Sequence, residues 1–198
     1  AASATSGAGL TFVDLAERET FHSYADVHAR ARRTAGALRA RGVAAGDLVA
    51  LVFPTSPAFV DCFFGVLLAG AVPVPLYPPV RLGRLAEYLA ATSRMIAAVG
   101  VRLVLADPAT RRLLGKAVES ARPELGCLTP EELGDGGELE VDVGPDELGL
   151  IQFSSGSTAD PRPVALSNAS LMAQLEALRA LLPPHEGVPQ KGVSWLPL

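Results

Sequence analysis

The sequence predicts an α/β fold with a mainly parallel sheet flanked by helices. Apolar segments of strand length alternate along the chain with longer segments whose apolar residues recur at helical spacing. Several of the strand segments are apolar throughout, as expected for a parallel sheet that is covered by helices on both faces. Hydrophobic residues make up 49% of the 198 residues and charged residues 19%, which is enough apolar material for a substantial core.

The N-terminal part is expected to hold a short strand and a long helix. Residues 1–10 are small and polar and are interpreted as a linker or a cloning remnant, and residues 12–16 can form a strand. Tyr24 to Arg41 is predicted to be a helix, because Ser23 and Asp26 have the Ser-x-x-acid spacing of a capping box. Five arginines of this stretch are interpreted as a solvated helical face: Arg30, Arg32, Arg33, Arg39 and Arg41.

A strand, a helix and a second strand are expected next. Asp47 to Phe53 is almost wholly apolar and is predicted to be a buried strand. Pro54 to Gly70 is predicted to be a helix, and it should be buried because it is apolar on nearly all sides. Ala71 to Leu76 resembles a strand, but Pro73 and Pro75 lack the N–H groups that full pairing requires.

The pattern repeats in the middle of the chain. A helix is expected from Leu82 to Val99 and a strand from Val101 to Ala106. Asp107 and the proline after it predict the start of a helix that reaches about Ala121. Thr129 to Glu132 has the spacing of a second capping box and predicts a short helix. The acidic, glycine-rich segment 135–144 is expected to be an exposed loop.

A hydroxyl-rich segment between two apolar runs is the candidate functional site. Leu148 to Phe153 is predicted to be a buried strand and Pro163 to Leu166 a second strand. The connecting loop can wrap N–H groups and hydroxyls around an anion, and a guanidinium nearby suits phosphate oxygens. The same composition also fits an ordinary turn or linker, and it matches neither the Walker A nor the G-x-G-x-x-G pattern. The candidate phosphate-binding residues are Ser154, Ser155, Gly156, Ser157, Thr158 and Arg162.

The C-terminal part is expected to add one helix and one strand. Ser167 can cap a helix that ends before the prolines at 183–184, and the sequence after the cap, from Asn168 to Ser170, also fits a glycosylation sequon. Val193 to Leu198 is predicted to be another buried strand. The apolar residues of the helix are Leu171, Met172, Leu175, Leu178 and Leu182.

Composition and charge argue against several classes of function. The net charge of −4 and the isoelectric point near 5.4 argue against a nucleic-acid surface. Cys62 and Cys127 lie far apart in apolar surroundings and the three histidines are scattered, so no metal site is predicted. Both cysteines are expected to be reduced, buried thiols, which suits the cytoplasm. No apolar run approaches the roughly 18 residues needed to span a bilayer.

Three segments in order resemble the core motifs of the adenylate-forming enzymes. Phe21 to Val27 resembles the first motif, Leu68 to Pro75 the second, and Ser154 to Val164 the third, which is the phosphate-binding loop. The resemblance begins at Thr11 and implies that residues 11–198 are an incomplete N-terminal subdomain of an AMP-binding (adenylation) domain. The fold it implies is part of the large N-terminal domain of an adenylate-forming enzyme.

Within these enzymes the sequence is most similar to the fatty acyl-AMP ligases. That family activates a fatty acid with ATP and Mg²⁺ and passes the acyl group to the phosphopantetheine arm of an acyl carrier protein, often in a polyketide or lipopeptide synthase. By this resemblance the hydroxyl loop would hold ATP phosphates, and Trp195 is either a wall of the acyl pocket or ordinary core. The segments that carry the similarity are 74–79, 151–158 and 194–198.

The third motif departs from the family at three positions. Ala159 and Pro163 stand where glycine is usual, and Arg162 stands where lysine is usual. Pro163 removes a backbone donor and restricts the residue before it to extended conformations, so a stiffer loop is expected. These departures leave open a degenerate, non-catalytic adenylation-like domain with a structural or docking role, and an acyl-CoA synthetase is a further alternative. The motifs that would complete the reaction fall beyond Leu198, so the 198 residues alone are expected to be inactive.

Overall fold

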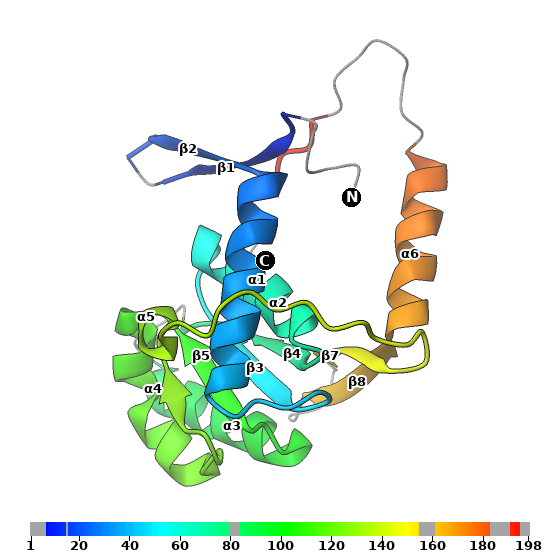
Figure 1. Ribbon diagram of the computed structural model, residues 1–198. Coiled ribbons are helices and arrows are strands. Elements are labelled where there is room, and N and C mark those ends of the chain that lie inside the picture. The colour runs from blue at the N-terminus through cyan, green and yellow to red at the C-terminus, as the bar shows by residue number, and fades with distance from the viewer. Residues whose placement is uncertain (1–6, 15, 80–83, 155–160, 183–190, 195–198) are drawn as a thin grey trace.

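The computed structural model describes residues 7–14, 16–79, 84–154, 161–182 and 191–194, and its centre is a parallel sheet. The sheet has four strands in the order β4-β3-β5-β6, and every neighbouring pair is parallel. Figure 1 shows this sheet between two layers of helices. The predicted α/β class with a mainly parallel sheet is therefore confirmed. The four strands are β3 (Leu48–Val52), β4 (Val72–Leu76), β5 (Leu103–Ala106) and β6 (Cys127–Leu128).

The two faces of the sheet are covered by different helices. On one face Leu51 and Leu105 pack in a buried cluster with residues of α1, α2 and α5. On the other face Val52 and Val104 pack with residues of α3 and α4. Adjacent residues of each strand therefore pack on opposite faces of the sheet, in two separate hydrophobic clusters. Both faces are buried, which is why these strands are apolar throughout. The five helices are α1 (Tyr24–Ala40), α2 (Pro57–Leu68), α3 (Leu85–Val99), α4 (Pro108–Ala121) and α5 (Pro130–Leu133).

The helix starts lie where the capping residues predicted them. The Ser23 hydroxyl accepts a hydrogen bond from the Asp26 N–H (3.1 Å), and the Asp107 carboxylate accepts from the Ala109 N–H (3.0 Å). Thr129 begins α5 with a complete capping box. One helix is less buried than expected: the α2 side chain Phe64 is 46% exposed.

Strand β4 forms one edge of the sheet, as its prolines predict. The Val72 N–H donates to the Asp47 carbonyl oxygen (2.9 Å), so the N–H side of this residue faces β3. Because backbone groups alternate along a strand, Pro73 and Pro75 have their nitrogens on the free edge, where no donor is needed.

A first hairpin stands beside α1 at the top of Figure 1. It consists of β1 (Gly9–Val13) and β2 (Glu19–Ser23), which pair antiparallel. Gly9 and Leu10 pair with Ser23 and His22, so these two residues of the segment predicted to be a linker belong to a strand.

A second antiparallel hairpin holds the candidate site and leads into the last helix. Its elements are β7 (Leu148–Ser154), β8 (Arg162–Ser167) and α6 (Asn168–Leu181). Strand β7 was expected to be buried, but only Gly149 and Ile151 are; the prediction is wrong because β7 lies outside the parallel sheet and, among the described strands, pairs with β8 alone. Ile151 and Phe153 still pack against the core beside β4.

Helix α6 lies apart from the sheet along the right of Figure 1 and buries none of its residues. Its apolar side chains Met172, Leu175 and Leu178 are 56%, 58% and 43% exposed. The predicted strand at 193–198 is wrong for its first two residues, which are exposed and have no regular structure. The rest of that segment, including Trp195, lies outside the described residues.

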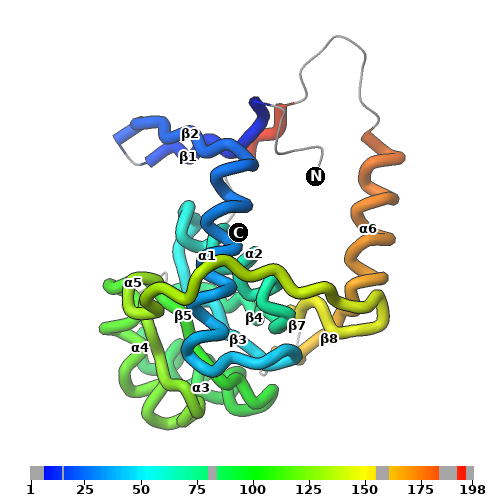
Figure 2. Tube along the Cα trace, viewed as in Figure 1, coloured from blue at the N-terminus to red at the C-terminus, as the bar shows by residue number. Residues whose placement is uncertain are grey.

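The acidic segment 135–144 is a loop with mostly exposed residues, as expected, and it also packs across two helices. Its Leu139 N–H donates to the Arg32 carbonyl oxygen (3.0 Å), and its Val141 N–H donates to the Leu68 carbonyl oxygen (2.8 Å). Figure 2 shows this segment crossing in front of α1 on its way from α5 to β7. A Cβ at Gly36 of α1 would overlap the carbonyl oxygen of Gly137, so glycine is needed where the chains cross.

The arginines of α1 are not a simple solvated face, as they were interpreted to be. The Arg30 guanidinium pairs with Asp61 of α2 (2.6 Å), and Arg32 pairs with Glu138 of the crossing segment (3.0 Å). Two more donate to main-chain carbonyl oxygens of other elements: Arg39 to that of Ala69 and Arg41 to those of Glu132 and Leu133. They therefore fix α1 against its neighbours.

Candidate phosphate-binding hairpin

The two ends of the hydroxyl loop meet at the loop end of the β7–β8 hairpin, where the chain passes from one strand to the other. Ser154, the last residue of β7, pairs with Arg162, the first residue of β8. The Ser154 hydroxyl donates a hydrogen bond to the Arg162 carbonyl oxygen over 3.3 Å, and both residues are exposed. Two of the six candidate residues are thus brought together. The other four, Ser155, Gly156, Ser157 and Thr158, lie outside the described residues.

The chemistry of the two described residues suits an anion. A separation of 3.3 Å is long for a hydroxyl donor, so the bond is weak and a phosphate oxygen can replace the carbonyl as its acceptor. Within the described ranges no carboxylate forms a salt bridge with the Arg162 guanidinium, which leaves its donors for a ligand. Hydrogen bonds between a guanidinium and a phosphate are charge-assisted and therefore strong.

Proline at position 163 is compatible with this hairpin. Pro163 pairs with Phe153, and Arg162 lies in the strand, as the restriction by a following proline predicts. Strand β8 has β7 as its only partner among the described strands, so it is an edge strand, where a missing N–H is tolerated. The departure from glycine therefore fixes the backbone of Arg162 without breaking the hairpin.

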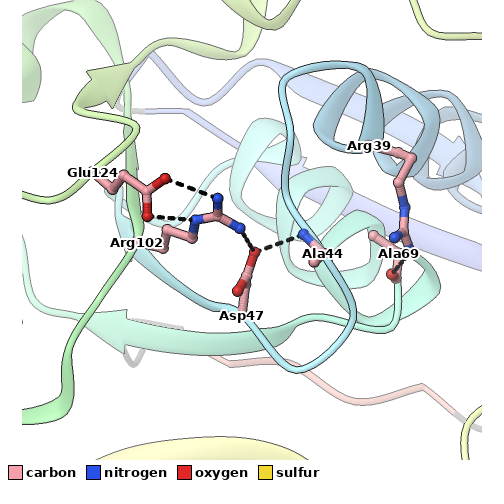
Figure 3. A network of polar contacts seen from close by, with 6 residues as sticks. All are labelled: Arg39, Ala44, Asp47, Ala69, Arg102 and Glu124. Carbon is pink, nitrogen blue, oxygen red and sulfur yellow. Dashed lines mark hydrogen bonds and ion pairs between the residues drawn. The ribbon is translucent and has the colours of Figure 1, made fainter.

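A polar cluster lies at the N-terminal ends of the sheet strands. The Arg102 guanidinium contacts Asp47 before β3 (2.6 Å) and Glu124 before β6 (3.0 Å), as Figure 3 shows. Hydrogen bonds from Arg102 lower the pKa of Glu124 below its usual value, and those to Glu124 and Asp47 raise the pKa of Arg102. The cluster joins three loops. It lies at the N-terminal ends of the strands, whereas ligands of open α/β sheets bind at the carboxyl ends, so we interpret it as structural.

Neither the two cysteines nor any acidic or histidine cluster of the described residues forms a second reactive centre. Burial raises the pKa of the Cys62 thiol to about 12 and that of the Cys127 thiol to about 11, which keeps both as unreactive thiols. Within the part of the chain that the structure describes, no group of three or more His, Cys, Asp or Glu side chains could hold a metal ion. The described helices include none that is long and apolar enough to cross a membrane.

One residue with a role in this hairpin escaped the sequence analysis. The Asn168 side chain donates to the Gly144 carbonyl oxygen (3.0 Å) and so joins the start of α6 to the turn before β7. The sequence offered little signal for it, because an asparagine after a serine cap is ordinary in a helix start and its partner lies 24 residues away.

Comparison with known proteins agrees with this structure. A family model described as AMP-binding enzyme matches residues 2–198. The chain is 32% identical to the 4-coumarate–CoA ligase 3 of Oryza sativa over 174 residues, which is 85% of this chain and 31% of that protein. It is 32% identical to the pyochelin synthetase PchE of Pseudomonas aeruginosa over 160 residues, covering 77% of this chain and 10% of that protein.

A solved structure gives the same picture. A structure from studies of fatty acyl-adenylate ligases of E. coli and L. pneumophila superposes with a TM-score of 0.84 and 30% sequence identity, covering 99% of this chain and 36% of that one. The chain thus spans about a third of the length of the ligases that it matches. Its α/β fold is that of the N-terminal domain of those proteins.

Proposed function

Because the chain belongs to the AMP-binding enzyme family, we propose that it supplies the phosphate-binding part of a fatty acyl-AMP ligase. In this proposal the full-length protein activates a fatty acid with ATP and transfers the acyl group to an acyl carrier protein, within a polyketide or lipopeptide synthase. The observation that carries it is the similarity to the fatty acyl-adenylate ligase structure over 99% of the chain. Similarity to pyochelin synthetase PchE supports a carrier protein as acceptor.

The proposed reaction gives the hairpin a defined task. A carboxylate oxygen of the fatty acid attacks the α-phosphorus of ATP, and pyrophosphate leaves. Catalysis of such a step depends mainly on positioning the phosphates and stabilising their charge. Arg162 would donate to oxygens of the departing pyrophosphate, and the Ser154 hydroxyl would exchange its bond to the Arg162 carbonyl for one to a phosphate oxygen.

Mg²⁺ would be held mainly by the phosphates of ATP. Magnesium usually keeps several waters and binds through substrate phosphates and one or two carboxylates. A dedicated cage of acidic residues is not required, and none is formed by the described residues. The ion would neutralise phosphate charge beside Arg162.

Acyl adenylate formation and transfer test the proposal in the full-length protein. Incubation with ATP, Mg²⁺ and fatty acids of medium and long chain should give acyl adenylates by mass spectrometry, and a holo carrier protein should then become acylated. Failure of every fatty acid to give an adenylate would refute the proposed activity.

The second candidate is an acyl-CoA ligase, and the similarity to 4-coumarate–CoA ligase favours it. Both candidates share adenylate formation and differ in the acceptor thiol. A transfer assay that offers free CoA and a holo carrier protein in parallel separates them. Preferential formation of acyl-CoA would replace the carrier-protein assignment by this second one.

A further inference from the structure

The side chains of the β7–β8 hairpin specify its register poorly. Register is strongly specified where one face of a strand pair is buried, because a slip by one residue moves every side chain to the other face. In this hairpin only Gly149 and Ile151 are buried, and β8 buries no residue. The pairing is also irregular between Leu148 and Leu150. Other contacts must therefore hold Ser154 opposite Arg162.

Contacts at the other end of the hairpin, where β7 begins and β8 ends, can hold this register, and they centre on Asn168. Its N–H donates to the Glu147 carbonyl oxygen (3.0 Å), and its side-chain Nδ2 donates to the Gly144 carbonyl oxygen (3.0 Å). The next N–H, of Ala169, donates to the Pro145 carbonyl oxygen (2.8 Å). The end of β8 is thereby fixed to the turn from which β7 starts.

Gly149 of β7 leaves the space in which the Asn168 side chain lies. A Cβ at this position would overlap the Asn168 Oδ1, so the amide can lie against β7 only because residue 149 is glycine. Gly149 also occupies the irregular step of the pairing, between Leu148 and Leu150. The Asn168 side chain therefore contacts both the turn before β7 and the strand itself.

We propose that Asn168 is a positioning residue that sets the β7–β8 register and so places Ser154 opposite Arg162 for phosphate binding. The expected effect of Asn168 on ATP binding rests on the proposed function. Its expected effect on the register of the hairpin does not. Asn168 touches no reacting atom, and it acts through the strands.

Asn168→Asp in the full-length protein is the direct test. This variant keeps the size of the side chain and one oxygen but removes the Nδ2 donor and sets a carboxylate against the Gly144 carbonyl oxygen. Gln174→Glu makes the same amide-to-carboxylate change at an exposed position of α6 and is the matched control. We expect Asn168→Asp to raise the KM for ATP roughly tenfold, in keeping with one lost hydrogen bond, and to leave the KM for the fatty acid unchanged.

A second pair of variants separates positioning from loss of stability. Gly149→Ala should also raise the KM for ATP, and in an Asn168→Ala background its added effect should shrink, because the closest overlap, with the amide, is gone and only that with the Leu171 side chain remains. Equal effects of Gly149→Ala in both backgrounds would contradict the proposed contact. A wild-type KM for ATP in Asn168→Asp, or a rise in both KM values together, would overturn the positioning role.

Hydrogen exchange gives a readout that does not depend on activity. Amides of 148–154 and 162–167 should exchange faster in Asn168→Asp than in Gln174→Glu, while amides of β3 and β5 keep their rates. If the wild-type protein forms no adenylate, the proposed function fails and this exchange pattern alone decides the role of Asn168. Unchanged exchange in the hairpin would overturn it.

Discussion

The Ser154 hydroxyl donates a hydrogen bond to the carbonyl oxygen of Arg162, its partner at the loop end of the β7–β8 hairpin, over 3.3 Å. This contact holds a hydroxyl and the backbone of a cationic residue side by side where the hydroxyl-rich loop begins and ends. In the proposed function the Ser154 hydroxyl and the Arg162 guanidinium donate to phosphate oxygens when ATP binds, so loss of either group should weaken ATP binding more than it lowers stability.

Removal of the Arg162 charge should weaken ATP binding in the full-length protein. Arg162→Ala is expected to raise the KM for ATP roughly 10- to 100-fold, the effect of losing charge-assisted hydrogen bonds, and Arg162→Lys should raise it less. Pro163 keeps the backbone extended in both variants. The measurement is the initial rate of adenylate formation at varied ATP, with Arg33→Ala on the exposed face of α1 as the control. An Arg162→Ala variant with a normal KM would remove this residue from the phosphate site.

Gly36→Ala should destabilise the protein although alanine favours helices. The new Cβ would overlap the Gly137 carbonyl oxygen of the crossing segment, which is backbone and cannot rotate away. We expect a loss of about 1–3 kcal/mol in the free energy of unfolding, the usual cost of overpacking. The control is Gly115→Ala in α4, where a Cβ meets nothing within 4 Å and should stabilise the protein by roughly 0.5–1 kcal/mol. Chemical denaturation measures both, and equal effects would contradict the close crossing.

The Arg102 cluster should make stability depend on pH in the acid range. Hydrogen bonds from Arg102 lower the pKa of Glu124 in the folded protein, so the carboxylate stabilises the fold above its usual pKa of 4.5. That contribution is lost as the pH falls through the lowered value. Between pH 5 and 3 the melting temperature of the wild type should therefore fall more steeply than that of Glu124→Gln. Glu119→Gln on α4 should follow the wild type; identical profiles for all three would exclude a role for Glu124.

The two cysteines should differ in their access to alkylating reagents. Both thiols have raised pKa values, but Cys62 is buried and Cys127 is only half-buried. At pH 8 iodoacetamide should modify Cys127 slowly and Cys62 only after unfolding, because the thiolate is the reactive form and burial excludes the reagent. Mass spectrometry of digested samples measures each site. Rapid labelling of Cys62 in the native protein would contradict its place in the core.

Local signals in the sequence predicted most of the elements. Caps such as Ser23, Asp107 and Thr129 act on N–H groups two or three residues away, so a short window contains both partners. The apolar strands of the parallel sheet were equally clear, because burial on both faces leaves no polar positions. The two strands on either side of the loop were predicted from their apolar runs, but their antiparallel pairing was not.

Long-range contacts account for what the sequence did not predict. The partners of Arg30, Arg39 and Arg41 lie 31, 30 and up to 92 residues away, so a basic helix was interpreted as a solvated face. Burial of β7 was overestimated because an apolar run does not reveal which sheet the strand joins. The crossing of α1 at Gly36 and the contacts of Asn168 likewise depend on tertiary structure, which no local pattern encodes.

Exchange of labelled pyrophosphate into ATP by the full-length protein, with and without fatty acid, tests the central claim most directly. The reverse of adenylate formation returns label to ATP only if the enzyme binds ATP and an activatable acid together. We predict exchange that depends on a medium- or long-chain fatty acid and on Mg²⁺ and that falls in Arg162→Ala. If hydrogen exchange shows that the protein is folded and no fatty acid supports pyrophosphate exchange, the account is contradicted.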